Sequence, residues 1–342
     1  MKEIKNTIKK GFLKKIFIKI CRIFGFEIID QSSFSIPSMN KQINNELSTL
    51  GKNSINIPLG EVKISRRVKA LDIIIRTCMK VEMLTQNKKR VFEKPKSEYT
   101  LRSINSLIKS YLNSESLKKI KVKFKIIDHE SGNENLNKIR NLFEKNKIDF
   151  DLINLDVAKF KENIKKINEE GNKVTDNQIS NMSNIHQSLI ESRDCEDLIY
   201  FIEDDYLHNL ESLDEMIFTY ERVASQLNDE IFICSTDYPY LYTKFENTNI
   251  LLGKKYHWRK IDETLCSFLT SKKMVNKHWG KLKSMCEIEH YPFEKPLHDI
   301  FKEELCISPI PSLSIHCTNI NSVYGLSPNF DWKNVWENNK IS

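Results

Sequence analysis

The stretch LIYFIEDDYLHN, residues 198–209, decides the fold. Its first five residues form an apolar run, which is typical of a short strand buried on both faces. Glu203, Asp204 and Asp205 follow with no spacer, and adjacent carboxylates resist being ionised together because like charges repel. Such a group becomes favourable where a divalent cation neutralises it, and oxygen ligands suit Mg²⁺ or Mn²⁺. The alternative is that the acids only end the strand at a surface turn.

Strand-like and helix-like patterns alternate around this stretch. Strands are expected at 71–78, 122–129, 149–155, 198–202 and 230–237. Helices are expected at 99–112, 134–145, 177–192 and 210–227, the last capped by Asn209. This alternation predicts an α/β fold with a mainly parallel sheet flanked by helices.

Polar residues end three of the expected strands. Arg76 and Asp128 occupy these positions in the first two strands, and the three acids follow the fourth. Because ligands of parallel sheets bind outside the carboxyl ends of the strands, these side chains are expected to share one ligand site.

The charge of the chain is unevenly distributed. The formal net charge of +7 comes from 53 basic and 46 acidic residues. Residues 1–24 hold eight bases and one acid, which is already +7, so the remainder is neutral. A neutral globular part argues against nucleic acid as a partner. The eight cysteines are scattered without a CxxC pair, as expected for reduced, buried thiols.

Residues 12–24, FLKKIFIKICRIF, place Phe, Leu and Ile on one side of a helical wheel and Lys and Arg on the other. This pattern predicts a helix lying on an anionic membrane surface. Lysines interrupt the apolar run, so the segment is neither a transmembrane span nor a signal peptide. The alternative is that the helix packs on the protein itself.

The stretch YFIEDDYLHN resembles the aspartate-rich, DXD-type motif of nucleotide-sugar glycosyltransferases with the GT-A fold, in an E-D-D form. The resemblance covers about residues 70–318 and is closest to family 2. LDIIIRTC and FKIIDHES resemble the first two strands of such enzymes, and SLSIHC resembles a late strand that often supplies a metal-binding histidine.

The resemblance implies a role for each matching residue. Asp205 would bind Mn²⁺ or Mg²⁺, and His316 would be a further ligand of the metal or of the pyrophosphate. The expected nucleotide contacts are Arg76 in the pocket wall, Asp128 on the base or ribose, and Glu203 or Asp204 on the ribose or a water.

An inverting transfer also needs a base near the acceptor hydroxyl. The resemblance points to Asp299 in EKPLHDIFKEEL, where an E-D pair is usual and His298–Asp299 stands instead. Asp299 equally fits a charge stabilised at the start of a helix. Asp237 in STDYPYLY is the second candidate.

The expected organisation is a basic surface helix (1–29), a linker or irregular cover (30–69), a catalytic domain (70–318) and a tail (319–342). Within the catalytic domain, 70–205 would bind the nucleotide sugar and 206–318 the acceptor. The expected function is metal-dependent, hexosyltransferase-type transfer to a glycan or lipid-linked acceptor of the cell surface. The enzyme would be cytoplasmic, peripheral on the inner face of the cell membrane.

Two alternatives stay open. A nucleotidyltransferase could use the same sheet, although IIIRTCMKVEML offers no glycine-rich phosphate loop after the first strand. A catalytically inactive membrane scaffold would retain the fold without turnover.

Overall fold

The computed structural model describes residues 16–26, 63–80, 90–243 and 247–341. The chain divides into two compact units, residues 1–63 and 64–342. In the first unit, residues 16–23 are helical, and Phe17, Ile20 and Ile23 are exposed. Residues 12–15 of the expected surface helix and 30–62 of the expected linker lie outside the described residues. Among the residues that are described, none belongs to a helix long and apolar enough to cross a bilayer.

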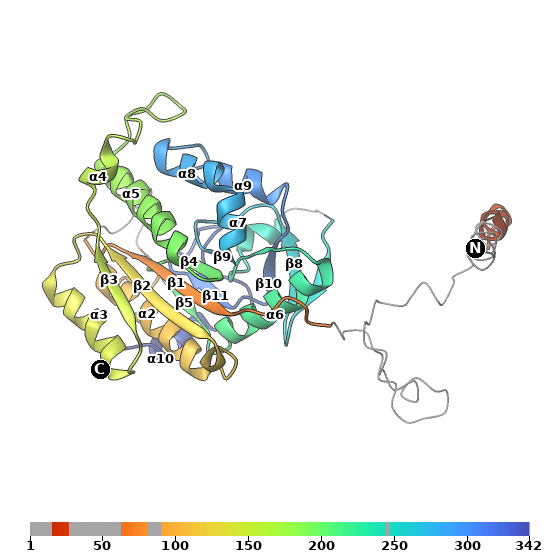
Figure 1. The fold of residues 1–342 in the computed structure, drawn as a ribbon, viewed down its shortest axis with the longest axis horizontal. Helices are drawn as coiled ribbons and strands as arrows, with labels where there is room; N and C mark the ends of the chain where they lie inside the picture. Colours follow the sequence, from red (N-terminus) through yellow and green to blue (C-terminus); the bar gives the residue numbers. More distant parts are fainter. Residues whose placement is uncertain (1–15, 27–62, 81–89, 244–246, 342) are drawn as a thin grey trace. The chain divides into compact units, whose positions relative to one another are not determined.

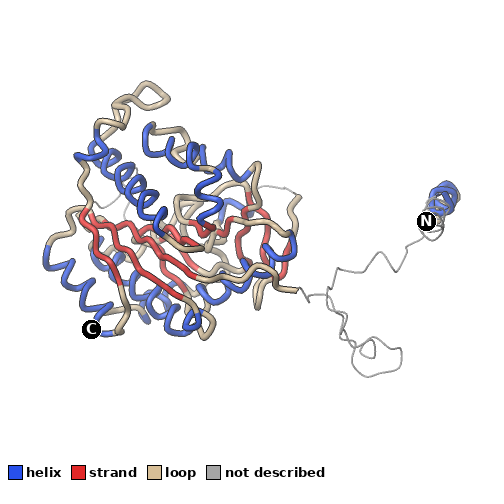
Figure 2. Tube along the Cα trace, in the orientation of Figure 1, coloured by secondary structure: helices blue, strands red, loops and turns tan. Residues whose placement is uncertain are grey.

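The second unit is built on a nine-stranded sheet (Figures 1 and 2). Its order is β3-β2-β1-β4-β9-β6-β10-β8-β7. The strands are β1 (Ala70–Thr77), β2 (Lys121–Asp128), β3 (Phe150–Asn154), β4 (Leu198–Glu203), β6 (Phe232–Ile233), β7 (Ile250–Leu252), β8 (His257–Ile261), β9 (Phe268–Ser271) and β10 (Cys306–Ile310). The first four in the order are all parallel, and the remaining part of the sheet is mixed. The expected α/β class with a large, mostly parallel sheet is confirmed.

Helices cover both faces of this sheet (Figure 1). The α-helices are α2 (Lys96–Asn113), α3 (Asn133–Lys145), α4 (Ala158–Lys161), α5 (Asp176–Glu191), α6 (Ser212–Leu227), α7 (Lys272–Lys277), α8 (Trp279–Glu287), α9 (Lys295–Phe301) and α10 (Trp332–Asn338). Short 3₁₀ turns are η3 (Leu117–Lys119), η4 (Ser192–Asp194) and η5 (Pro239–Tyr242). Helix α2 packs against α3 and α6, whereas α5 packs against α4, α8 and strands β1 and β2.

Strand β1 aligns the polar strand ends. All eight of its residues are buried, and it pairs in parallel with β2 on one side and β4 on the other. The register places Arg76 beside Glu203 and Thr77 beside Asp128. The polar residues at the ends of β1, β2 and β4 therefore lie at the same edge of the sheet.

A second, two-stranded sheet places a late segment of the chain at this edge of the large sheet. Strand β5 (Tyr206–His208) pairs antiparallel with β11 (Ser314–His316), so His316 lies opposite Tyr206. The backbone N–H of Cys317 donates to the carbonyl of Asp205 at 2.8 Å. The segment that resembled a late strand is therefore a strand, and it runs directly beside the acids.

The expected strand 230–237 is reduced to Phe232–Ile233. Its continuation leaves the sheet because the carbonyl of Ser235 accepts backbone N–H groups from Leu313 and Ser314, both at 3.0 Å. The helix after the acids also starts later than expected, at Ser212. The side chain of Asn209 accepts from the N–H of Glu211 at 3.1 Å, and therefore stabilises the turn before this helix.

Residues 319–341, expected as a tail, belong to the second unit and carry α10. Trp336 is buried in a satellite apolar cluster with Tyr99 of α2 and Leu207 of β5. The backbone carbonyl of Trp336 accepts from Arg102 at 2.5 Å. This end of the chain therefore braces the start of α2, from which two of the groups described below project.

Candidate active site

A cavity of about 630 Å³ opens at the carboxyl ends of β1 and β4. The amide-rich face of α5 and the segment 289–294 before α9 both line it. Arg76, all three acids and His316 line it. The structure therefore brings together five of the residues that the sequence singled out.

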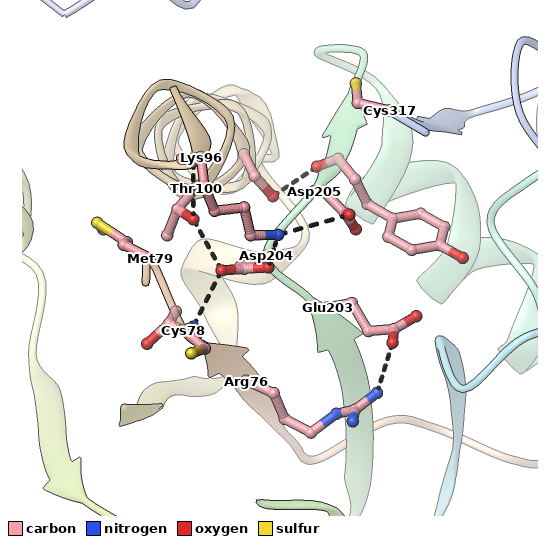
Figure 3. A network of polar contacts seen from close by, with 12 residues as sticks. Arg76, Cys78, Met79, Lys96, Thr100, Glu203, Asp204, Asp205 and Cys317 are labelled. Carbon is pink, nitrogen blue, oxygen red and sulfur yellow. Dashed lines mark hydrogen bonds and ion pairs between the residues drawn. The ribbon is translucent and has the colours of Figure 1, made fainter. Parts of the chain in front are cut away.

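Both carboxylate oxygens of Asp204 make contacts within the protein (Figure 3). Its Oδ1 contacts the ammonium of Lys96 at 2.5 Å. Its Oδ2 accepts from the hydroxyl of Thr100 at 2.7 Å and from the backbone N–H of Cys78 at 3.2 Å. Because both of its carboxylate oxygens are bound within the protein, Asp204 ties α2 to the ends of β1 and β4.

Asp205 faces three positively charged or proton-donating groups. Arg90 contacts its Oδ2 at 2.7 Å and Lys96 contacts the same oxygen at 3.5 Å. The Nε2 of His316 lies 3.5 Å from Oδ1. Burial alone would raise the pKa of Asp205, but these three neighbours hold it well below its usual range. Asp205 is therefore a buried carboxylate anion at neutral pH.

His316 is held in one orientation. Its ring stacks on that of Tyr206, with centroids 4.8 Å apart and planes within 9°. Nδ1 lies 3.1 Å from the carbonyl oxygen of Tyr324, which can only accept, so Nδ1 carries the hydrogen. Burial opposes a charged imidazole, but Asp205 outweighs it and raises the pKa of His316. Nε2 is thus the atom turned toward Asp205.

Glu203 is the most accessible of the three acids, with 29% of its side chain exposed. Its Oε1 lies 3.0 Å from the guanidinium of Arg76, which also donates to Asn181 of α5 at 2.9 Å. Glu203 and Arg76 are therefore positioned to contact a ligand in the cavity.

Asp128 does not line the cavity. It accepts from the hydroxyl of Thr77 at 2.7 Å, and from the backbone N–H and hydroxyl of Ser131 at 3.1 and 2.5 Å. These bonds make Asp128 a buried brace of the turn after β2. Its neighbours Thr77 and His129 face the cavity instead.

The two expected bases also lie outside the cavity. Asp299 is not at a helix start, because α9 begins at Lys295, and its carboxylate pairs with Lys302 at 2.6 Å. Asp237 is buried and forms an ion pair with Arg259.

Three residues in this region were not anticipated from the sequence. Arg90 and Lys96 are single cations in a chain rich in lysine, so no local pattern marks them. Glu294 lines the cavity, and burial, reinforced by the charge of Glu203, raises its pKa to about 7. The only local signal is that prolines bracket it in YPFEKP, which marks a loop.

Asp205 and His316 are the candidate ligands of a divalent cation. Asp205 and His316 present a carboxylate oxygen and a ring nitrogen 3.5 Å apart, and the carbonyl of Tyr324 fixes the tautomer as in metal-bound histidines. Within the described ranges, no group of three or more His, Cys, Asp or Glu side chains gathers in metal-binding geometry. Two ligands suit Mg²⁺ or Mn²⁺ when substrate phosphates supply the others. The residues therefore fit a cation shared with a diphosphate.

No protein-family model matches this chain, and no curated protein matches it. Solved glycosyltransferase structures show a partial likeness. The galactosyltransferase LgtC with donor and acceptor sugar analogs is 12% identical, with a TM-score of 0.33, over 59% of this chain and 58% of LgtC. This chain therefore spans less than two thirds of LgtC.

Mouse xyloside xylosyltransferase 1 is 10% identical, with a TM-score of 0.36, over 68% of this chain and 76% of that one. The bifunctional glycosyltransferase WbbM is 9% identical, with a TM-score of 0.33, over 64% of this chain and 34% of that one.

The role of Asp204 as a brace predicts a stability effect. Asp204→Asn leaves the buried ammonium of Lys96 poorly compensated, so we expect the free energy of unfolding to fall by about 3 kcal/mol. The double variant Asp204→Leu with Lys96→Met should lose less free energy of unfolding than the losses of Asp204→Leu alone and Lys96→Met alone added together. Urea unfolding measures all three. Asp299→Asn, which breaks an exposed pair, is the control and should leave the midpoint unchanged. A negligible effect of Asp204→Asn would contradict this role.

Proposed function

We propose that this protein is a GT-A-type glycosyltransferase that moves a sugar from a nucleoside-diphosphate donor to a glycan or lipid-linked acceptor. The observation that carries the proposal is the convergence of Asp205, His316 and two buried cations beside a carboxyl group of raised pKa, in one cavity at the strand ends. Such a cavity, with few placed polar groups and perturbed pKa values, is the usual form of an active site.

The nucleoside would lie along α5. This wall offers the amide side chains of Asn177, Gln178, Asn181 and Asn184, with Thr77 and His129 at the strand ends. Amides both donate and accept hydrogen bonds, as recognition of a base and ribose requires. Arg76, fixed between Glu203 and Asn181, would line the same subsite.

The diphosphate would lie near Asp205. Arg90 and Lys96 supply positive charge there, and guanidinium groups bind phosphate oxygens in a bidentate manner. Asp205 and His316 would hold Mn²⁺ or Mg²⁺, which when bound offsets the charge developing on the leaving diphosphate. Asp204 would keep this region in place rather than touch the donor.

Glu294 would be the base for an inverting transfer, in place of Asp299. A base works best when its pKa is near the working pH, and burial raises the pKa of Glu294 to about 7. Glu294 also lines the cavity, as do the amides of α5. A carboxylate there would take the proton from the acceptor hydroxyl as it attacks the sugar.

The N-terminal helix would bring the enzyme to a membrane-bound acceptor on the inner face of the cell membrane. In the described part of that helix, Phe17, Ile20 and Ile23 are exposed, and Lys19 and Arg22 carry positive charge. An apolar side with flanking cations favours an anionic interface. This location is consistent with synthesis of a surface polysaccharide.

The donor site predicts metal-dependent nucleotide binding. In a thermal-shift panel of UDP, GDP, dTDP, CDP and CMP, one diphosphate with Mn²⁺ should raise the melting temperature by several degrees, because a ligand that binds only the native state stabilises it. Asp205→Ala should abolish the shift, whereas Asp299→Ala should retain it. If no nucleotide stabilises the protein with or without Mn²⁺, the transferase assignment fails and an inactive scaffold is favoured. Release of pyrophosphate from a nucleotide substrate would instead identify a nucleotidyltransferase.

The base predicts a pH profile. Glu294 must be ionised to accept a proton, so the rate of sugar transfer or donor hydrolysis should rise with pH and level off above about 7. Glu294→Gln should lower the rate by about 10²- to 10⁴-fold while preserving the thermal shift with nucleotide. The exposed Glu303→Gln serves as the control. Undiminished turnover by Glu294→Gln would exclude this residue as the base.

A further inference from the structure

The three acids at the end of β4, Glu203 to Asp205, are each matched by a cation from an earlier part of the chain. The pairs are Glu203 with Arg76 at 3.0 Å, Asp204 with Lys96 at 2.5 Å and Asp205 with Arg90 at 2.7 Å. Figure 3 shows the ammonium of Lys96 lying between the two aspartates. The charges of these three pairs sum to zero, so the acids at the end of β4 carry no surplus negative charge of their own with which to attract a metal ion.

Arg90 and Lys96 both contact Oδ2 of Asp205, the residue proposed to hold the metal. A divalent ion at the Asp205 carboxylate would therefore lie a few ångströms from two positive charges. All three side chains are buried, with less than a tenth of each exposed. Because screening by water is weak there, this repulsion opposes binding of the metal alone.

A diphosphate reverses this balance. The diphosphate of a nucleotide sugar brings two negative charges, which a divalent cation matches, so that the two enter together without net charge; the terminal phosphate of a free nucleoside diphosphate adds further negative charge. The diphosphate also offers phosphate oxygens to a guanidinium. Lys96 is anchored to Asp204, whereas Arg90 lies in the segment before α2 and contacts Asp205 and the carbonyl of Cys317 at 3.1 Å. Arg90 is therefore the cation positioned to give up its contact with Asp205 and bind a phosphate oxygen instead.

We propose that Arg90 is an internal counter-ion of Asp205 that makes metal binding conditional on the donor: in the nucleotide-free protein Arg90 competes with the divalent cation, and it turns to the diphosphate when both bind. The inference rests on the proposed function in taking a diphosphate as the ligand. It makes Arg90 a positioning residue. The diphosphate must raise the affinity for the metal by the same factor by which the metal raises the affinity for the diphosphate.

The test measures free Mn²⁺ by electron paramagnetic resonance during titration of the intact protein. Wild-type protein should bind Mn²⁺ alone weakly. Its affinity should rise at least about fivefold with the diphosphate that stabilises it in the thermal panel, after correction for Mn²⁺ bound by the nucleotide in solution. Arg90→Gln should bind Mn²⁺ alone about tenfold more tightly than wild type, because the competing charge is gone. The rise in Mn²⁺ affinity that the diphosphate causes should be smaller for Arg90→Gln than for wild type.

Two variants serve as matched controls. Arg90→Lys keeps the charge and should bind Mn²⁺ alone as weakly as wild type does. Arg66→Gln removes a partly buried arginine that pairs with Asp197, which precedes β4 at the opposite edge of the sheet, and should leave Mn²⁺ affinity unchanged. These controls separate loss of the Arg90 charge from a general loss of stability.

The inference is overturned if wild-type protein binds Mn²⁺ alone as tightly as with diphosphate, a comparison that needs no variant to fold. It is also overturned if folded Arg90→Gln binds Mn²⁺ no more tightly than wild type. In either case, a thermal shift with a nucleoside diphosphate would leave the transferase proposal standing, so the two failures are distinguishable.

Discussion

Three consecutive carboxylates at the end of a buried strand impose the constraint on which the arrangement of this protein depends. A buried charge is costly unless it is paired and hydrogen-bonded. The chain meets this requirement with elements that are remote in sequence: β1 supplies Arg76, the start of α2 supplies Lys96, and the segment before it supplies Arg90. Strand β11 adds His316 from near the other end of the chain. The edge of the sheet is thus held together largely by charge.

The three acids share a motif but have separate tasks. Both carboxylate oxygens of Asp204 are bound, by side chains of α2 and by the backbone after β1, so Asp204 acts as a brace. Asp205 is an anion with one oxygen turned toward His316, and these two residues are the ones proposed to share a metal. Glu203 lies nearest to solvent and shares Arg76 with the wall of α5. Neighbours in sequence therefore differ because successive side chains at a strand end face different surroundings.

The sequence predicts the strands around the acids because apolar runs and strand-end polarity are local signals. It also places His316 correctly on a late strand beside Asp205. It does not predict Lys96 or Arg90, because an ion pair formed across about a hundred residues leaves no local pattern. It names Asp128 as a nucleotide contact, whereas bonds to Thr77 and Ser131 hold this side chain outside the cavity, and its two candidate bases, Asp299 and Asp237, also lie outside it. The pKa of Glu294 arises from burial, which only the packed structure reveals.

The central claim is that the cavity at the ends of β1 and β4 binds a nucleoside diphosphate through Asp205 and His316. The most direct measurement is an anomalous-scattering map from crystals grown with Mn²⁺ and the nucleoside diphosphate that stabilises the protein. We expect a single manganese peak in contact with the Asp205 carboxylate and the Nε2 of His316, bridging to the diphosphate, with the nucleoside along α5. A nucleotide bound elsewhere, or a diphosphate in this cavity with no manganese beside Asp205, would contradict the claim.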